Sequence, residues 1–217
     1  MLDFKGIKFQ WLGHDGFKIV ADGKTIYIDP YQLSKAQHAK NDADIVMITH
    51  DHFDHLNIDD LKHVVGKRTV IVAAKKCAAQ LKPLGLEVNS VAPGDRVTVQ
   101  GVQVEAVESY NMGKTFHPKA DRNVGYVITL NGVRVYHAGD TDDIPEMSQV
   151  HADVALVPVS GTYVMTADEA ARAVNERIKP KMLAIPMHYA SIVGSEGDAR
   201  RFKELVSTCP VEILERE

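Results

Sequence analysis

The amino-acid sequence predicts an α+β domain in which two β-sheets pack face to face and helices cover their outer faces. Two observations support this fold class. Both halves of the chain contain hairpin-forming strands, and both contain continuous apolar runs separated by helical segments. Periodicity alone leaves a plain α+β domain nearly as well supported, so the functional motifs decide between the two. The 217 residues contain no linker or low-complexity stretch, which predicts one domain over residues 1–217.

In the first half, strand patterns cover residues 7–12, 17–20 and 25–28. The Asp22-Gly23 pair between the last two of these strands is typical of a hairpin turn. The continuous apolar run Ala43–Ile48 suits a strand that is buried on both faces. The pattern then predicts a helix at Asn57–Val65 with Asn57 as N-cap, a strand at 69–72, a helix at 73–81 and strands within 87–107.

In the second half, a hairpin is predicted over Asn123–His137, with its turn at Asn131-Gly132. The helix predicted at Ala167–Lys179 opens with Thr166-x-x-Glu169, which matches a capping box, and Pro180 ends it. The remaining predicted elements are buried strands at 153–157 and 182–185, a helix at Ser195–Ser207 and a last strand at Val211–Leu214.

Composition excludes several classes of protein. A net charge of −4 and a pI near 6.2 provide no basic surface for broad nucleic-acid or membrane binding. No run of about 18 apolar residues is present, and the N-terminus lacks the pattern of a signal peptide. Cys77 and Cys209 are far apart in sequence, which argues against a disulfide framework or a thiolate zinc site. A cytoplasmic location is therefore expected.

Ten histidines are the unusual feature of the composition. Three of them, with two carboxylates, lie in the segment His50-Asp51-His52-Phe53-Asp54-His55, between a buried strand and a helix. His50 and His52 point the same way in extended chain, whereas Asp54 and His55 lie around the turn and face a second point. Because a catalytic zinc needs about three such ligands, the spacing predicts the start of a two-metal site. A polar loop that caps a helix is the less favoured alternative.

Further ligands are expected from other strand ends. Asp140 ends the hairpin strand at a Gly turn, where its carboxylate could bridge two cations or simply form an Asx turn. His188 follows the apolar strand MLAIPM, and His117 lies in a long stretch without regular pattern. For His117, a solvated loop is as well supported as a functional one.

At these residues the chain resembles the metallo-β-lactamase superfamily, because HDHFDH matches its H-x-H-x-D-H signature. The resemblance covers nearly the whole chain. Within the superfamily, the chain most resembles the compact single-domain branch that is similar to ascorbate-6-phosphate lactonase and N-acylphosphatidylethanolamine phospholipase D. The other matching segments are Gly13-His14, Ile28-Asp29-Pro30, the strand end 137–141 (HAGDT), the segment 158–165 and the segment 185–189 (IPMHY).

The resemblance implies an αββα sandwich with a binuclear metal site at one edge. Carried over by position, His50 and His52 would bind the first metal, Asp54 and His55 the second, Asp140 would bridge them and His188 would complete the second. This chain departs from the superfamily at one ligand. The superfamily has a middle histidine after the strand that corresponds to residues 102–107, whereas here that segment is Glu108-Ser109-Tyr110-Asn111 and contains no histidine. We expect His117 to replace it; Asn111 as a weak oxygen ligand, or an under-coordinated first metal, are the alternatives.

The expected activity is that of a metal-dependent hydrolase, in which a metal-activated water attacks a small ester, lactone or phosphodiester. Two divalent ions are expected as cofactors. Zinc is favoured, with manganese, iron and cobalt open, because the ligand set offers nitrogen and oxygen without sulfur. Two residues are expected to take part in catalysis. Asp54 would orient the water, and His14 would line the mouth of the site, where it donates to a leaving group or contacts substrate.

Some second-rank residues and alternatives remain. Asp29 could orient a ligand imidazole, although a plain strand-end turn is slightly favoured; Tyr163 and Tyr189 are weaker candidates; and His38, His63 and His151 are expected at the surface. A nucleic-acid phosphodiesterase is disfavoured, with only the segment Lys114–Arg122 as support. A non-enzymatic metal-binding protein with a decayed site is the third hypothesis. The expected partner is a small-molecule substrate, and a homo-oligomer is left open.

Overall fold

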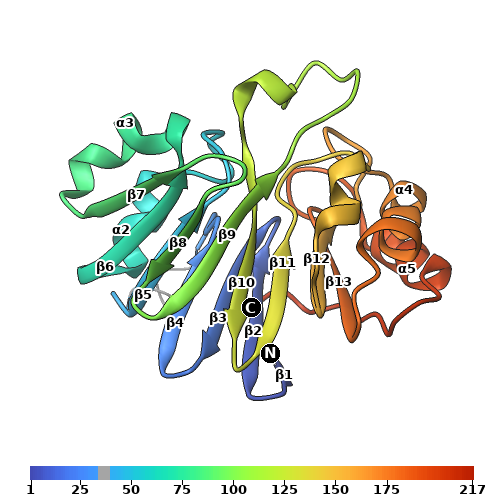
Figure 1. Ribbon diagram of the computed structural model, residues 1–217, viewed down its shortest axis with the longest axis horizontal. Helices are drawn as coiled ribbons and strands as arrows, with labels where there is room; N and C mark the ends of the chain where they lie inside the picture. The colour runs from blue at the N-terminus through green and yellow to red at the C-terminus, as the bar shows by residue number, and fades with distance from the viewer. Residues whose placement is uncertain (34–39) are drawn as a thin grey trace.

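The computed structural model describes residues 1–33 and 40–217. Two sheets face each other, and the helices lie outside them (Figure 1). The first sheet contains β1 (Leu2–Phe4), β2 (Ile7–Gly13), β3 (Gly16–Ala21), β4 (Lys24–Ile28), β5 (Ala43–Ile48), β6 (Val65–Ala74) and β7 (Glu87–Val91), in that spatial order. The second contains β8 (Arg96–Val99), β9 (Val102–Glu108), β10 (Val124–Leu130), β11 (Val133–His137), β12 (Val154–Pro158) and β13 (Leu183–Met187), again in chain order.

The helices cover the outer faces of the parallel strands. α2 (Ile58–Val64) and α3 (Ala78–Leu81) connect the strands from β5 to β7, whereas α4 (Ala167–Arg172) and α5 (Glu196–Leu205) cover β12 and β13. In Figure 1 the first pair lies at the left and the second at the right. This is the four-layer sandwich that the sequence predicts, and the fold class is confirmed.

Both sheets have the same internal plan. Strands β1–β4 and strands β8–β11 are antiparallel neighbours, and in each sheet the following strands run parallel to the last of these. The side chains between the sheets form one apolar core. The phenol of Tyr126 on β10 donates to the Ile48 carbonyl of β5 at 2.7 Å, which ties the two sheets together. Because parallel strands end at one edge, the loops that follow them meet there.

Local sequence signals explain several element boundaries. Asn57 caps α2, because its side chain accepts from the backbone N–H groups of Asp59 and Asp60. The strands β12 and β13 are buried along their whole lengths, as expected for continuous apolar runs in a parallel sheet. The predicted helix at 167–179 consists of α4 followed by a π-helical turn at Ala173–Ile178. It ends at Lys179, whose φ of +47° is left-handed.

The structure differs from the predicted elements in three places. The strand β1 was not predicted, and the helix at 73–81 begins later because β6 extends to Ala74 and a 3₁₀ turn follows. The last predicted strand, Val211–Leu214, is wrong: Val211 forms a single bridge to Ala184. The chain then crosses to the first sheet, where Arg216 donates to the Leu12 carbonyl, so no second rung forms beside β13.

Among residues 1–33 and 40–217, no helix has the length and hydropathy that crossing a membrane requires. The surface prediction for His38 falls outside the described residues.

The capping box of α4 provides a test of local stability. The Thr166 hydroxyl accepts from the Glu169 N–H at 3.2 Å, and the Glu169 carboxylate accepts from the Thr166 N–H at 2.8 Å. We expect Thr166→Ala to lower the free energy of unfolding by about 1 kcal/mol, because the N–H of Glu169 loses its partner. Urea denaturation measures the change. Ser148→Ala is the control, because this exposed hydroxyl only donates to the Pro145 carbonyl. An equal loss in both variants would contradict the prediction.

Candidate metal centre

The histidine cluster lies where strand ends of both sheets meet. The segment 50–55 follows β5, Asp140 follows β11 and His188 follows β13. His14 lies in the turn between β2 and β3, and His117 lies in the long loop between β9 and β10 that rises above the sheets in Figure 1. The structure therefore brings the predicted site residues together from five segments of the chain.

Three imidazoles form the first group: His50, His52 and His117. The Nδ1 atom of His52 lies 3.1 Å from Nε2 of His50 and 2.9 Å from Nε2 of His117. Their ring nitrogens all lie within 4.8 Å of one another, as donors to one cation would. His117, expected as the replacement for the missing middle histidine, therefore lies beside the first two.

The carboxylate of Asp140 lies between this group and a second one. Its oxygens are 3.4 Å from Nε2 of His55 and 3.3 Å from Nε2 of His188. On the other side, they are 3.5 Å from Nε2 of His117 and 4.0 Å from Nε2 of His50. Asp140 is therefore placed to share one carboxylate between two cations, in the position expected of a bridging ligand.

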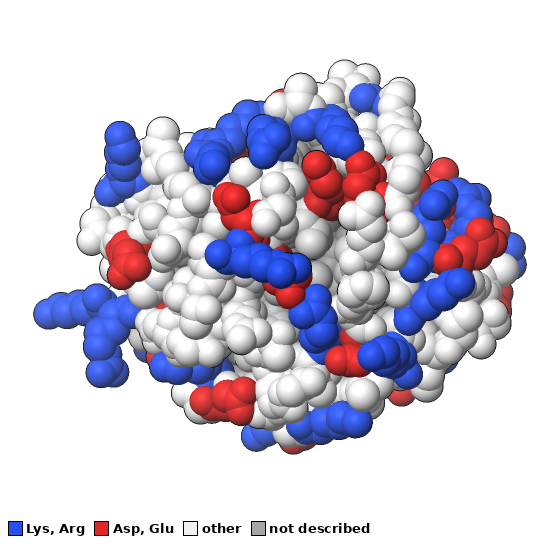
Figure 2. Space-filling view, in the orientation of Figure 1, with Lys and Arg blue, Asp and Glu red and all other residues white. Residues whose placement is uncertain are grey.

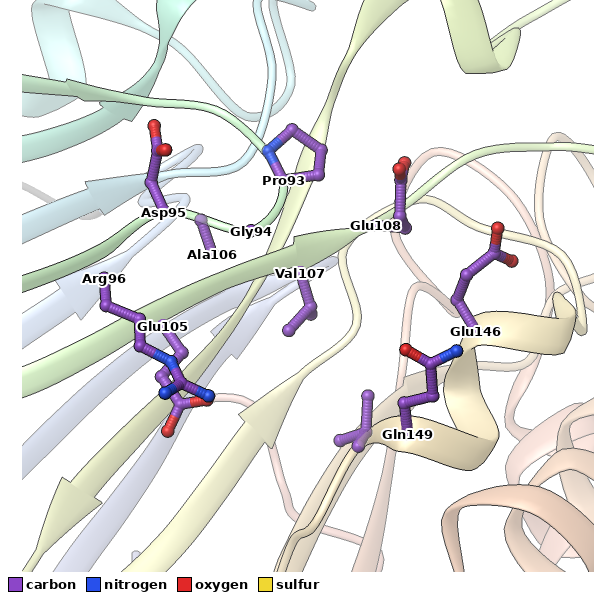
Figure 3. Close-up of a pocket in the computed structure, with 11 residues that line it drawn as sticks. Pro93, Gly94, Asp95, Arg96, Glu105, Ala106, Val107, Glu108, Glu146 and Gln149 are labelled. Atoms are coloured by element: carbon purple, nitrogen blue, oxygen red, sulfur yellow. The ribbon is translucent and has the colours of Figure 1, made fainter.

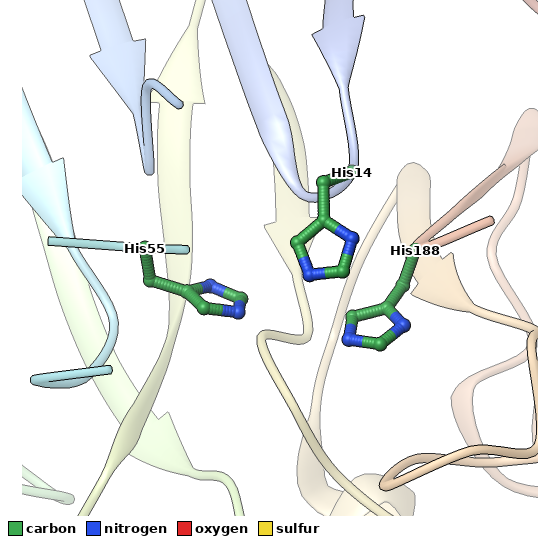
Figure 4. A group of neighbouring side chains, drawn as sticks. All are labelled: His14, His55 and His188. Carbon is green, nitrogen blue, oxygen red and sulfur yellow. The ribbon is translucent and has the colours of Figure 1, made fainter. Parts of the chain in front are cut away.

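The second group contains three imidazoles, those of His14, His55 and His188. Figure 4 shows their rings turned toward one another. The rings of His14 and His188 are 3.9 Å apart between centroids. His14 Nε2 lies 3.1 Å from an oxygen of Asp54. Its side chain is only 1% exposed, so the expectation that His14 lines the mouth of the site is wrong. The turn at residues 13–16 buries it beneath Asp54.

Four of the imidazoles have a hydrogen-bond partner at Nδ1 and turn Nε2 toward Asp140. The Nδ1 partners are Asp29 for His55 (2.9 Å), Thr49 Oγ for His50 (3.0 Å), Ser160 Oγ for His188 (2.9 Å) and the Tyr163 carbonyl for His117 (3.4 Å). A donor role at Nδ1 leaves the lone pair on Nε2, which is the tautomer that a metal requires. The orientation of these rings is therefore set from behind the site.

Asp29 is the centre of this outer layer. Its carboxylate is fully buried and accepts from His55 Nδ1, from the Thr49 N–H at 2.9 Å and from the Thr49 hydroxyl at 2.5 Å. Through Thr49 it also holds His50. The sequence favoured a plain strand-end turn at Asp29, and the backbone does turn there, with φ at +42°. In addition, the Asp29 carboxylate connects both groups of histidines.

Several site atoms are buried without a partner in the described structure. Oδ1 of Asp140 and Nε2 of His55 lack hydrogen bonds, although both belong to polar groups that are costly to bury alone. Both carboxylate oxygens of Asp15 are also buried without a hydrogen-bond partner. Asp15 was not among the site residues predicted from the sequence. Asp15 lies within ligand distance of Asp140 and His188. Unpartnered atoms that converge from several strands fit a cation pair, so the residues present suit the metals expected.

The protonation states of His50, His117 and Asp140 suit metal binding. Burial lowers the pKa of His50 well below its usual value and lowers that of His117, so both imidazoles are neutral near pH 7. Although burial opposes it, proximity to His188 and His55 holds the pKa of Asp140 well below its usual range. Burial also lowers the pKa of His14 to about 4. Neutral imidazoles and an ionised carboxylate are the forms that bind a divalent ion. His55 differs because, although burial opposes it, Asp140 and Asp29 hold its pKa well above the usual value, so a cation would have to displace its proton.

Backbone conformation indicates a preorganised site. His14, His117 and His188 have φ values of +52°, +59° and +59°, a region that residues with a Cβ rarely adopt. Such conformations cost free energy and persist where the surrounding structure fixes them, as at functional sites. The strand ends therefore hold these three histidines in orientations that an ordinary loop would not favour.

The remaining candidates lie around the centre. Asn111 lies behind His117, with Nδ2 3.2 Å from its Nδ1, and donates to the Phe116 carbonyl. Tyr189 is buried and stacks on Trp11, with centroids 4.7 Å apart. Among the other histidines, His137 is buried and contacts the Asp15 carbonyl at 2.9 Å, His63 is half-buried on α2 and His151 is exposed.

Comparisons with known proteins agree with this geometry. The family described as "Beta-lactamase superfamily domain" matches residues 8–188. The UPF0173 metal-dependent hydrolase of Thermoplasma acidophilum is 32% identical, over 97% of this chain and 95% of its own. A UPF0173 metal-dependent hydrolase of Thermococcus onnurineus is 34% identical over 92% of each chain.

Solved structures share the fold. A protein from Parabacteroides distasonis superposes with a TM-score of 0.83 at 31% identity, covering 97% of this chain and 94% of the other. A metallo hydrolase from Ignicoccus hospitalis superposes with a TM-score of 0.79 at 25% identity, covering 97% and 95%. The predicted superfamily is confirmed, and with it the prediction of an enzyme of this class. The chain therefore belongs to the β-lactamase superfamily, within a group of metal-dependent hydrolases.

Proposed function

We propose that this protein hydrolyses a small ester, lactone or phosphodiester with a pair of divalent cations, zinc being the favoured metal. The observation that carries the proposal is the position of Asp140 between two groups of imidazoles, within 4.0 Å of a nitrogen of each of four histidines. A mononuclear or purely structural site needs no shared carboxylate. Two sets of nitrogen donors joined by one carboxylate suit a binuclear hydrolytic centre.

The residues divide between the two metals by their positions. His50, His52 and His117 would hold the first, because their ring nitrogens converge on one point. Asp54, His55 and His188 would hold the second, and Asp140 would bridge. Oxygen and nitrogen ligands without sulfur leave manganese, iron and cobalt as alternatives to zinc. When bound, such a cation pair supplies Lewis acidity toward a carbonyl or phosphoryl oxygen and lowers the pKa of a water molecule.

The protein's own groups would place the reacting molecules. Asp54 lines a cavity together with His52 and Asp140, so its carboxylate would accept a hydrogen bond from the attacking water. His14 is neutral and its Nε2 lies within hydrogen-bond distance of Asp54, so it would donate there and fix the orientation of the carboxylate. His14 is therefore proposed as a positioning residue that acts through Asp54.

Surface charge gives no support to a nucleic-acid substrate. On the face that Figure 2 shows, positive and negative side chains are interspersed. The amino groups of Lys114 and Lys119, in the loop that offered the only local support, form ion pairs with Asp142 and Glu146. A nucleic-acid enzyme needs cations free to contact phosphates. A small-molecule substrate is therefore the stronger proposal.

Removal of one proposed ligand tests the function. We expect the purified protein to contain about two divalent ions per chain and to hydrolyse at least one member of a panel of lactones, esters and phosphodiesters. His52→Ala is expected to lose the first metal and this activity, because two nitrogens cannot hold a catalytic ion with the same affinity as three. Elemental analysis and initial rates measure both.

The matched control is His151→Ala, which removes an exposed imidazole just before the start of β12, at the opposite end of that strand from the metal centre, and is expected to leave metal content and rate unchanged. Hydrolysis that persists after complete metal removal would contradict the proposed function. One loosely held metal without hydrolysis would instead support a non-enzymatic metal-binding protein.

A further inference from the structure

Exposed aromatic side chains surround the opening of the metal centre. A cavity of about 240 Å³ opens beside it and is lined by His52, Asp54, His117 and Asp140, and by three aromatic residues, Phe53, Phe116 and Tyr163. These three rings are 65%, 47% and 46% exposed. Large apolar side chains that gather in solvent around a concave site mark a binding surface.

The three rings line two sides of the cavity, and each side follows strands of a different sheet. Phe116 and Tyr163 follow strands of the second sheet and pack edge to face, with centroids 5.0 Å apart. Phe53 follows β5 of the first sheet and packs edge to face on Tyr31, at 5.9 Å. Such pairs restrict the rings to defined orientations. The opening therefore presents a preformed apolar surface directly beside the proposed metal ligands.

Positive charge is missing from this cavity. Of the described residues that line it, none is lysine or arginine, whereas two are aspartates. The nearby Lys114 is occupied, because its amino group contacts Asp142 and donates to the Val164 carbonyl. A substrate with an additional anionic group would thus meet carboxylates and aromatic rings here, and no side-chain cation. This disfavours phosphates and sugar phosphates.

A larger cavity elsewhere provides a contrast. The cavity of about 360 Å³ in Figure 3 is lined largely by polar residues, including Arg96, Glu105 and Glu146. Two of its carboxylates are already paired: Glu105 accepts from Arg134 at 2.7 Å, and Glu146 accepts from the Tyr110 phenol at 2.9 Å. That cavity contains no group of histidines. Apolar walls and metal-binding groups occur together at the opening next to Asp54.

We propose that the substrate is a small uncharged ester or lactone bearing an aromatic or branched apolar group, which Phe53, Phe116 and Tyr163 bind. This inference rests on the proposed function and narrows its substrate class. A volume of about 240 Å³ lies below the range of about 300–1,000 Å³ typical for drug-sized ligands, so the bound portion is compact. The apolar walls hold the group, and Asp54 and Asp140 face the bond that is hydrolysed.

Two hydroxamic acids of different size test the inference in the metal-loaded protein. Acetohydroxamate and benzohydroxamate chelate a metal in the same way and differ in the group that they direct outward. We expect calorimetry to show that benzohydroxamate binds about tenfold more tightly than acetohydroxamate. We expect 4-sulfobenzohydroxamate to lose this advantage, because its sulfonate would lie among uncharged aromatic side chains. In Phe116→Ala, the ratio between the first two ligands is expected to fall to about threefold or less.

Ile192→Ala is the matched control, because this apolar side chain is exposed but does not line the cavity. It is expected to keep the tenfold ratio. Initial rates on γ-butyrolactone and γ-phenyl-γ-butyrolactone should show the same preference in kcat/KM, and the same loss in Phe116→Ala. Circular dichroism and metal content of the variants separate a binding effect from misfolding.

Equal affinity of the wild type for the two uncharged hydroxamates, or a ratio unchanged in both Phe116→Ala and Phe53→Ala, would overturn the inference. A protein that binds no metal would instead overturn the proposed function. In that case an NMR titration of the metal-free protein with ethyl benzoate tests the aromatic opening alone. Shifts confined to the amides of residues 53, 116 and 163 support it, and their absence contradicts it.

Discussion

Asp140→Asn is expected to lower kcat/KM by about 1,000-fold or more and to remove most of the bound metal. The substitution keeps the shape of the side chain but removes the negative charge that lies within 4.0 Å of ring nitrogens of His50, His55, His117 and His188. A neutral amide cannot bridge two cations as a carboxylate does. Since metal ions contribute several kcal/mol to the stabilisation of a hydrolytic transition state, their loss corresponds to at least three orders of magnitude.

The measurement combines metal analysis after dialysis with initial rates on the best substrate of the panel. Asp168→Asn is the matched control. It makes the same chemical change at an exposed carboxylate on α4, where the partner is Arg201 at 2.9 Å. That variant is expected to keep both metals and at least half of the activity, because exposed ion pairs contribute little. An Asp140→Asn protein that retained two ions would show that Asp140 does not bridge.

The parts of the site predicted from sequence are those that short-range patterns determine. His50, His52 and His55 lie close together in sequence, directly after the buried strand β5, so their convergence follows from one turn. The ends of β11 and β13 could be placed at the same edge because parallel strands end together. Asp140 and His188 were expected near the cluster because both follow strand ends and lie in the segments 137–141 and 185–189, which resemble the superfamily.

The outer layer could not be predicted in the same way. The contact between His188 and Ser160 joins two loops, and the contact between His117 and the Tyr163 carbonyl joins two more. Hydrophobic periodicity describes strands and helices but carries no information on the course of such loops. The burial of His14 and of Asp15 depends on how the turn after β2 packs against other strand ends, which is also a long-range property.

The last predicted strand has the local pattern of a strand but does not form one in the structure. Val211–Leu214 has a strand-like pattern, but the tail has to reach Trp11 of the first sheet within a few residues, as the Glu217 N–H bond to the Trp11 carbonyl at 3.0 Å shows. Tertiary connection therefore overrides the local preference for strand. The same tail places Arg216 against the Leu12 carbonyl, next to the turn that carries His14.

Asp29 is expected to contribute strongly to the stability of the fold, although it is not one of the proposed ligands. In Asp29→Ala, the buried N–H and hydroxyl of Thr49 and the Nδ1 of His55 lose their shared acceptor. An unsatisfied buried donor costs about 1–3 kcal/mol, and losing one partner of a buried charged pair costs about 3–5 kcal/mol. We therefore expect the free energy of unfolding to fall by about 3–5 kcal/mol, measured by urea denaturation of the metal-free protein.

Asp29→Asn separates stability from metal binding. The amide keeps one oxygen for Thr49 but presents an N–H to a neighbouring donor, and the His55 ring avoids this conflict only by moving its proton to Nε2. That tautomer has no lone pair for a metal, and Thr49 can no longer hold His50 in the same way. We expect metal affinity to fall about 10- to 100-fold, as typical of changes behind a metal ligand, with a smaller loss of stability than in Asp29→Ala.

Asp44→Asn is the matched control, because Asp44 also accepts from a backbone N–H, that of Thr25 at 2.9 Å, but lies at the other end of the strands. Competition with a chromophoric chelator gives the metal affinities of the three proteins, and urea denaturation gives their stabilities. If Asp29→Asn bound metal as tightly as Asp44→Asn, the carboxylate would serve only to join β4 to the loop after β5. A selective loss of affinity would instead show that one buried side chain orients histidines of both groups.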